Sequence, residues 1–260
     1  MNFKTRLFLI LWIAGLASVL SFFLVDLSAL LANLPVTAGT SLPFSPWLLK
    51  LLSIIQTSIL LSVAVFVGVA LASRVGLSSP AAEAAASRGN IASALKPQIA
   101  PGLTGGLAGG LAILSTWLLW RPFLPAEFVT RAERLNKSLP FLTRLLYGGI
   151  IEELLLRWGV MTLLVWLAWQ LLQKGRGEPR VIFFVIAIII SSVVFGLGHL
   201  PLASALGADF TVAIVSYVVV ANSVFGLIAG YLYWKKGLEA AMIAHMLIHV
   251  VIITGIYFGK

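Results

Sequence analysis

The amino-acid sequence predicts an all-α fold: a polytopic bundle of about seven transmembrane helices, with one amphipathic helix at the membrane interface. Of its 260 residues, 60% are apolar and only 10% are charged, and the mean hydropathy is +1.04. A soluble globular domain carries roughly 25% charged residues. The basic residues, which give a net charge of +9, cluster between long apolar runs, as loops at an anionic lipid surface do. The sequence therefore predicts an integral, multi-pass membrane protein.

Seven apolar runs are candidates for membrane spans, each of which needs about 20 residues. They cover residues 7–34, 47–72, 103–120, 141–172, 181–201, 208–234 and 237–258. The first run has no small-x-small cleavage pattern, which favours an uncleaved span over a signal peptide. The third is short and rich in glycine, and no Gly-Lys-Ser/Thr follows it. Close helix packing is therefore a better interpretation of these glycines than a phosphate-binding loop.

Two of the connections between the apolar runs are each expected to contain a helix outside the membrane core. Residues 73–101 form the longest polar connection, with an Ala/Ser-rich middle that favours a short surface helix. Residues 121–140 mix charged with large apolar side chains, a pattern typical of an amphipathic interfacial helix.

Charge and cysteine content predict the membrane orientation and exclude some kinds of chemistry. Seven spans place the termini on opposite sides, and more Lys and Arg residues fall on the N-terminal side, which predicts a cytoplasmic N-terminus. No basic helix face is interleaved with aromatic residues, so nothing indicates nucleic-acid binding. The chain has no cysteine, which excludes disulfides, thiolate nucleophiles and thiolate metal sites.

Six of the ionisable side chains inside the apolar runs are candidates for function. Three are in the fourth run and the three histidines of the chain are in two others: Glu152, Glu153, Arg157, His199, His245 and His249. A charge inside a bilayer costs several kcal/mol, so such residues normally face the interior of a bundle and serve chemistry or transport there. The lipid bilayer is thus an expected partner, and the six residues are candidate functional residues.

The fourth run contains a carboxylate pair and an arginine. Glu153 and Arg157 are four residues apart and share one helix face, so they can form an ion pair. Glu152 points roughly 100° away and stays available as a general base. The alternative is that all three residues form a buried ionic cluster that only holds helices together.

The histidines occur in two patterns. His199 shares a helix face with Phe195, and it lies close to the end of its run. His245 and His249 are four residues apart, a recurring arrangement of metal ligands. The alternatives are a histidine satisfied by packing and a pair that bridges helices by hydrogen bonds.

The sixth run holds a polar interruption and a glycine pair. Asn222 is expected to bond either a catalytic group or a neighbouring helix. Gly226 and Gly230 are expected to pack tightly against another helix.

Together these residues resemble the CPBP family, the intramembrane endopeptidases related to type II CAAX prenyl proteases and bacteriocin-processing (Abi-like) proteins. The family pattern is Glu-Glu-x-x-x-Arg, then Phe-x-x-x-His, then His-x-x-x-Asn/Asp, on separate membrane helices. The chain reads Glu152-Glu153-x-x-x-Arg157, Phe195-x-x-x-His199 and His245-x-x-x-His249. The resemblance covers residues 140–250, which suggests two parts: transmembrane helices in 1–120 and a catalytic core in 121–260.

The resemblance implies hydrolysis of a peptide bond inside the membrane. Glu152 and His199 would activate the attacking water, and Glu153 and Arg157 would be the supporting pair. The expected substrate is a peptide or a lipid-modified protein.

The last motif departs from the family pattern. The resemblance assigns His245 and the residue four positions later to stabilising the oxyanion, and this second residue is His249 where the family has Asn or Asp. The change leaves open a Zn²⁺ site on His199, His245 and His249. No cofactor is certain, because zinc would also need carboxylates to orient its imidazoles, and only Glu153 and Glu239 are plausible partners of that kind.

Two other functions remain alternatives at this point. One is a non-proteolytic membrane scaffold or immunity-type protein that uses the polar cluster for packing. The other is an ion or proton transporter that uses Glu152 and the histidines as a relay.

Overall fold

The described part of the chain is entirely helical. In this computed structural model, residues 1–32, 44–207 and 209–258 are described, and none of them lies in a β-strand. Six helical stretches are long and apolar enough to cross a membrane: Phe3–Leu24, Pro46–Val75, Ile91–Phe123, Val181–Ala205, Val212–Lys236 and Leu238–Gly255. Their outward side chains are apolar; Phe66 and Leu118, for example, are 65% and 66% exposed. The chain is an integral, multi-pass membrane protein, as predicted.

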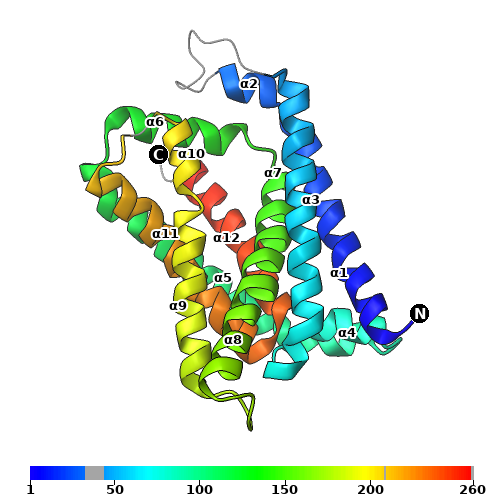
Figure 1. The fold of residues 1–260 in the computed structure, drawn as a ribbon. Coiled ribbons are helices and arrows are strands. Elements are labelled where there is room, and N and C mark those ends of the chain that lie inside the picture. Colours follow the sequence, from blue (N-terminus) through cyan, green and yellow to red (C-terminus); the bar gives the residue numbers. More distant parts are fainter. Residues whose placement is uncertain (33–43, 208, 259–260) are drawn as a thin grey trace.

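The long helices form a bundle. The first of them begins at one end of the bundle, and the last finishes at the opposite end (Figure 1). They are α1 (Phe3–Leu20), α3 (Pro46–Leu71), α5 (Ile91–Trp120), α9 (Val181–Leu197), α11 (Val212–Lys236) and α12 (Leu238–Phe258). At the end where α1 starts, the short helix α4 (Pro80–Ala86) lies beside the turn between α11 and α12, and the Leu238 amide donates to the Ser78 carbonyl (3.1 Å).

The predicted fourth span is a helix with an unusual winding. It runs through α7 (Phe141–Thr143), η5 (Arg144–Glu152), η6 (Leu154–Met161) and α8 (Thr162–Leu172), and both η5 and η6 are π-helical. π turns are rare and are frequently found at functional sites. With the six long helices, this interrupted helix accounts for the predicted number of about seven spans.

Two predicted spans have wrong boundaries. The first apolar run, predicted over 7–34, breaks after α1 into the 3-10 turn η1 (Ser21–Leu24) and the separate helix α2 (Leu27–Ala32). Asp26 accounts for the break, because its carboxylate accepts a hydrogen bond from the Ala29 amide (2.9 Å) and caps α2. Residues 33 and 34 of that prediction lie outside the described residues.

The third span begins at Ile91 and not at residue 103. Asn90 caps its start by accepting a hydrogen bond from the Ser93 amide (3.0 Å). Pro97 and Pro101 lie inside the helix, although prolines in a sequence favour a connection over a helix interior. The predicted surface helix within 73–101 is the short α4.

The glycines act as predicted, by allowing helices to approach closely. A Cβ on Gly106 of α5 would lie 2.7 Å from the Cβ of Leu247 on α12. A Cβ on Gly226 of α11 would lie 2.7 Å from the Cβ of Ser192 on α9. Both distances are shorter than real Cβ contacts, so α5, α9, α11 and α12 pack at separations that only glycine permits.

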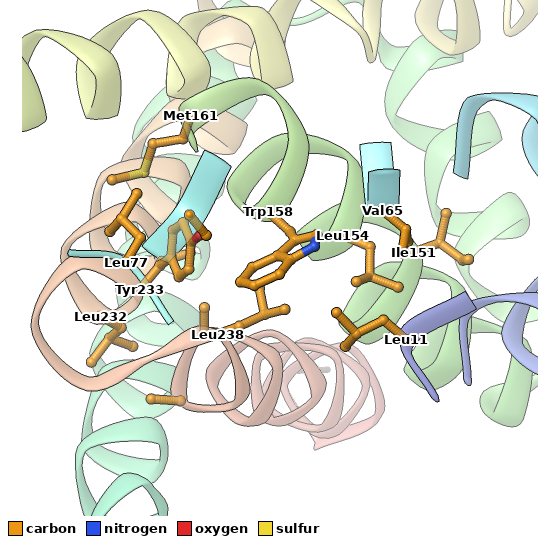
Figure 2. Packing of buried hydrophobic residues seen from close by; sticks show 14 of the residues in the cluster. Leu11, Val65, Leu77, Ile151, Leu154, Trp158, Met161, Leu232, Tyr233 and Leu238 are labelled. Atoms are coloured by element: carbon orange, nitrogen blue, oxygen red, sulfur yellow. The ribbon is translucent and has the colours of Figure 1, made fainter. Parts of the chain in front are cut away.

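The main core joins the N-terminal helices to the rest of the bundle. Trp158 is 1% exposed and its indole fills the space beside Gly68 that a Cβ would need. Figure 2 shows it surrounded by side chains from α1, α3, η5, η6, α11 and α12 and from the connection before α4, among them Leu11, Val65, Leu77, Ile151, Leu154, Met161, Leu232, Tyr233 and Leu238. The division of the chain at residue 120 stays a prediction, and the two predicted parts share this core.

A second core lies at the other end of the bundle, under the amphipathic helix α6 (Ala126–Ser138). Its buried face, with Phe128, Val129 and Leu135, packs against α10 (Leu200–Ala205) and the first turns of α11. Figure 1 shows α6 crossing the end of the bundle. The helix that the sequence predicts over 121–140 is therefore present, preceded by the 3-10 turn η4 (Arg121–Phe123).

Candidate active site

A cavity of about 170 Å³ lies between the helices that carry the three motifs. Four of the six candidate residues line it: Glu152, His199, His245 and His249. The other two, Glu153 and Arg157, lie behind its wall and are 0% exposed. The structure thus brings all three motifs to one place inside the bundle.

His245 is the centre of the arrangement, because its imidazole lies between both carboxylates. Its Nδ1 lies 2.8 Å from Glu153 Oε1, and its Nε2 lies 3.6 Å from Glu152 Oε2. A carboxylate accepts hydrogen bonds, so the short contact to Glu153 places a proton on Nδ1 of His245. The other nitrogen is thereby directed at Glu152, whose side chain is 22% exposed and reaches the cavity.

The predicted pair of Glu153 and Arg157 is present. Arg157 Nε lies 3.3 Å from Glu153 Oε2, and Arg157 Nη2 donates to the Gly226 carbonyl on α11 (3.1 Å). The guanidinium also lies 5.2 Å from the centre of the Phe195 ring, within cation–π range. Arg157 thus compensates the charge of Glu153 and fixes its position, while Glu152 has no arginine partner among the described residues.

His199 reaches the cavity although its run of apolar residues ends close by. Helix α9 ends at Leu197, and His199 forms the turn into α10. Its Nδ1 lies 2.8 Å from the Phe195 carbonyl, and its ring packs edge-on against the Phe195 ring with centroids 4.8 Å apart. A carbonyl can only accept, so Nδ1 carries a proton and Nε2 is the basic nitrogen of the neutral ring. Within the described residues no hydrogen bond joins His199 to Glu152; they share the cavity.

His249 stacks on His245, with ring centroids 5.1 Å apart and planes at 18°. Both of its ring nitrogens are buried and have no hydrogen-bond partner among the described residues. Gly148 of η5 lies directly opposite, where a Cβ would overlap with Nε2 of this ring. Buried polar atoms normally have partners, so these two nitrogens are hydrogen-bonding capacity that the described part of the protein leaves unused.

Several residues of the cavity were missed or left open by the sequence analysis. Gly148 makes room for His249, and the only signal in the sequence is a Gly-Gly pair one turn before the glutamates. Tyr217 of α11 and Ile113 of α5 line the cavity, and a tyrosine inside an apolar run is a weak signal. Asn222, for which two partners were open, lines the cavity and donates to the Val218 carbonyl of its own helix (2.7 Å).

The tentative zinc ligands do not form a metal site in this arrangement. Among the described residues, no group of three His, Asp or Glu side chains is placed to hold an ion. His199 and His245 each direct one ring nitrogen at a protein oxygen. The zinc question stays a prediction, and no step proposed below passes through a metal.

Comparison with known proteins agrees with the motifs. Residues 134–251 match the family model described as type II CAAX prenyl endopeptidase Rce1-like. The match begins in α6 and ends in α12, so it contains every residue of the three motifs. No curated protein and no solved structure matches the chain. The resemblance predicted from the sequence is confirmed over these residues.

Proposed function

We propose that this protein is an intramembrane endopeptidase that hydrolyses a peptide bond near the end of a prenylated or otherwise lipid-modified protein. One observation carries the proposal: His245 lies between Glu152 and Glu153 at a cavity that also receives His199 and His249. A purely structural cluster would pair its polar atoms with one another and leave no cavity. Here two imidazole nitrogens of His249 are unpaired, and Glu152 is partly accessible.

The attacking water lies between Glu152 and His199 in the proposed mechanism. Glu152 removes one proton from this water as its oxygen attacks the carbonyl carbon of the substrate. His199 accepts a hydrogen bond from the same water through Nε2, because its Nδ1 proton is held by the Phe195 carbonyl. The two contacts orient the water for attack.

The oxyanion that forms is stabilised by the histidines of α12. His249 presents an N–H group with no competing partner in the described part of the protein, as an oxyanion hole requires. His245 Nε2 lies 3.6 Å from Glu152, so it can take up the proton that Glu152 removed and then also donate to the oxyanion. When the C–N bond breaks, that proton passes to the leaving amine, and the remaining hydrogen of the water stays with the new carboxyl group.

Glu153 and Arg157 support this chemistry without contacting the substrate. Glu153 holds the Nδ1 proton of His245 at 2.8 Å, which fixes the orientation of the ring, and Arg157 holds Glu153.

The test is cleavage of a defined substrate by the purified protein in lipid nanodiscs. The substrate is an internally quenched farnesylated peptide with a CAAX end, and the variants are Glu152→Gln and, as a matched control, Glu127→Gln on α6. Loss of a general base typically lowers the rate by about 10²–10⁴-fold. We expect that loss for Glu152→Gln only, because the Glu127 side chain is 80% exposed and lies outside the cavity.

Two results would overturn the proposal. Equal cleavage by Glu152→Gln would remove this residue from catalysis and favour a scaffold. A proton or ion flux in proteoliposomes that disappears in Glu152→Gln, without any peptide cleavage, would favour a transporter. Repeating the assay after dialysis against a chelator tests the zinc prediction, since metal-independent cleavage would be unaffected.

We further propose that the end of the bundle with α4 and the N-terminus faces the cytoplasm, because most Lys and Arg residues of the connections lie on that side. The chain has no cysteine, so single cysteines can be introduced for labelling. Ser87→Cys, after α4, is expected to resist a membrane-impermeant thiol reagent added outside the cell, and Ser28→Cys in α2 is expected to react. The reverse pattern would invert the orientation.

A further inference from the structure

From the wall that α11 contributes to the cavity, we infer that Tyr217 and Asn222 are positioning residues that hold the backbone of the peptide substrate. Both residues line the cavity with the catalytic candidates, and neither belongs to the three motifs. The inference rests on the proposed function, since it concerns the same site and the same peptide.

Asn222 offers a hydrogen-bond acceptor to the cavity. Its amide nitrogen donates to the Val218 carbonyl one turn earlier (2.7 Å), which fixes the rotation of the side-chain amide. Its side-chain carbonyl has no hydrogen-bond partner among the described residues. A peptide N–H is the donor that an extended substrate would bring to this place.

Tyr217 offers a hydroxyl group. Its ring packs against Trp117 of α5 (centroids 5.6 Å apart) and edge-on against Phe128 of α6 (6.5 Å), so the phenol is held between two other helices. The residue is half-buried, and within the described part of the chain its hydroxyl has no hydrogen-bond partner. A peptide carbonyl is the acceptor that would complete it.

The spacing of the two residues fits an extended peptide. Five residues of α-helix rise about 7.5 Å, and about two residues of an extended chain cover that distance. Phe225, one turn beyond Asn222, touches the His245 ring with centroids 4.4 Å apart. Asn222 therefore lies nearer the reacting bond, and Tyr217 binds about two residues further along, toward α6.

The rest of the cavity wall offers few hydrogen bonds to a peptide backbone, so the two polar groups of α11 are expected to contribute to binding. Apart from the catalytic candidates and the two positioning residues, the lining is apolar: Ile113, Phe195, Ala221, Phe225, Ile248 and Ile252. A peptide group that enters such a site without a hydrogen bond loses its bonds to water and gains none in return, which disfavours binding. The same wall suits aliphatic side chains on the substrate.

The inference is tested by steady-state kinetics with the quenched farnesylated peptide. The variants are Tyr217→Phe and Asn222→Leu, which remove one polar group each at nearly constant volume. A neutral hydrogen bond contributes about 0.5–1.5 kcal/mol, or about 2–13-fold, so we expect KM to rise by about 3–10-fold while kcat stays within about twofold. The control is Ser216→Ala on the same helix, whose hydroxyl bonds Trp120 (3.0 Å) and does not line the cavity.

A second substrate isolates the hydrogen bond of Asn222. In this peptide, single ester groups replace the amide groups near the cleaved bond one at a time, so each version lacks one N–H. In the version that lacks the N–H bound by Asn222, the KM of the wild type is expected to rise by the same factor as Asn222→Leu raises it with the amide peptide. The KM of Asn222→Leu is expected to be the same for that version and for the amide peptide.

The outcomes distinguish a failure of the positioning role from a failure of the proposed function. If the wild type cleaves the peptide but both variants keep its KM, or lose kcat at constant KM, the positioning role is overturned and the proposed function stands. If the wild type cleaves no such peptide, the proposed function falls and this inference with it. Thermal midpoints of the variants within a few degrees of the wild type show that the fold is retained, and Tyr217→Phe removes only one oxygen atom should Asn222→Leu fail to fold.

Discussion

Helix α12 has polar contacts in two places, and their hydrogen-bond partners differ. At its start, Glu239 accepts hydrogen bonds from the Ser79 hydroxyl (2.7 Å) and the Ala82 amide (3.0 Å), and Gln98 accepts one from the Ala240 amide (3.1 Å). These partners belong to the first turns of α4 and α12, whose amides have no partner within their own helix. Two turns further on, His245 bonds other side chains, and His249 faces the cavity without a partner among the described residues.

The difference separates a structural from a functional polar group. At the α4 junction, side chains complete the hydrogen bonding of helix ends, and the benefit is stability. At the cavity, charged side chains fix one another and leave hydrogen-bonding capacity for a substrate. Glu239 also has one buried oxygen, Oε2, without a partner among the described residues, so the cavity beside the unpaired atoms, and not their presence alone, distinguishes the functional group.

The largest expected effect is on stability, from breaking the buried pair. In Arg157→Met, Glu153 keeps a buried charge without its cation and the Gly226 carbonyl loses a donor. Breaking a buried ion pair costs about 3–5 kcal/mol, measured as a loss of unfolding free energy in mixed micelles. Arg121→Met is the control, because the Arg121 side chain is 55% exposed at its pair with Glu133 and such pairs contribute at most about 1 kcal/mol. Equal losses in both variants would contradict the structural role of Arg157.

At the α4 junction, we expect a loss of stability without a loss of chemistry. Glu239→Ala removes the acceptor that serves Ser79 and the start of α4, and loss of a cap costs about 0.5–2 kcal/mol. The thermal midpoint should fall while kcat on the quenched peptide is retained. Glu178→Ala, at an exposed position, should change neither. A strong fall in kcat for Glu239→Ala would show that the two polar regions act together.

At the cavity, we expect the opposite: a loss of chemistry with little loss of stability. In Gly148→Ala the new methyl group would occupy the place of the His249 ring nitrogen and displace it from the cavity. A donor lost from an oxyanion hole costs about 10²–10³-fold in kcat, and partial displacement should cost about tenfold. Gly89→Ala is the matched control, since the nearest atoms to its Cβ would be 3.5 Å away. Unchanged kcat in Gly148→Ala would remove His249 from the mechanism.

The smallest effect concerns pH and the other carboxylate of the junction. Partial burial, and to a lesser degree repulsion by Glu239, raise the pKa of Glu83 above the ordinary 4.5. An acid with a raised pKa in the folded state stabilises the fold when it is protonated, so this stability is present below about pH 4.5 and is lost as the pH rises through the folded-state pKa. The thermal midpoint of Glu83→Gln, measured from pH 4 to 7, should vary slightly less than that of the wild type. A steeper dependence in the variant would reverse the sign.

Much of the fold follows from composition and from spacing within one helix. The apolar runs predict the helices, and the four-residue spacing predicts the pair of Glu153 and Arg157. The start of α5 does not follow from the sequence, because Pro97 and Pro101 favour a connection and the cap at Asn90 is a single polar residue within a polar stretch. The break in the first run was missed as well, since one aspartate is a weak signal in an apolar sequence.

The contacts between helices could not be predicted from spacing. Glu153 was named as a possible carboxylate partner for an imidazole, but its bond to His245 joins residues 92 positions apart. His199 looked too close to the end of its run, because the sequence does not show that α9 turns into α10 at that residue. The π-helical winding of η5 and η6 could not be predicted either, since π turns are rare and most are single turns inside α-helices.

That winding makes the length of one segment a determinant of the chemistry. In a π turn the hydrogen bonds join residues five apart, and in an α-helix they join residues four apart. Each turn of η5 therefore contains more residues than a turn of an α-helix. Deleting a single residue between Arg144 and Gly148 would let the backbone relax to the shorter turn and rotate the N-terminal half of the helix against the half that contains Trp158. Insertions and deletions, which loops tolerate easily, are thus as damaging in this apolar stretch as the replacement of a glutamate.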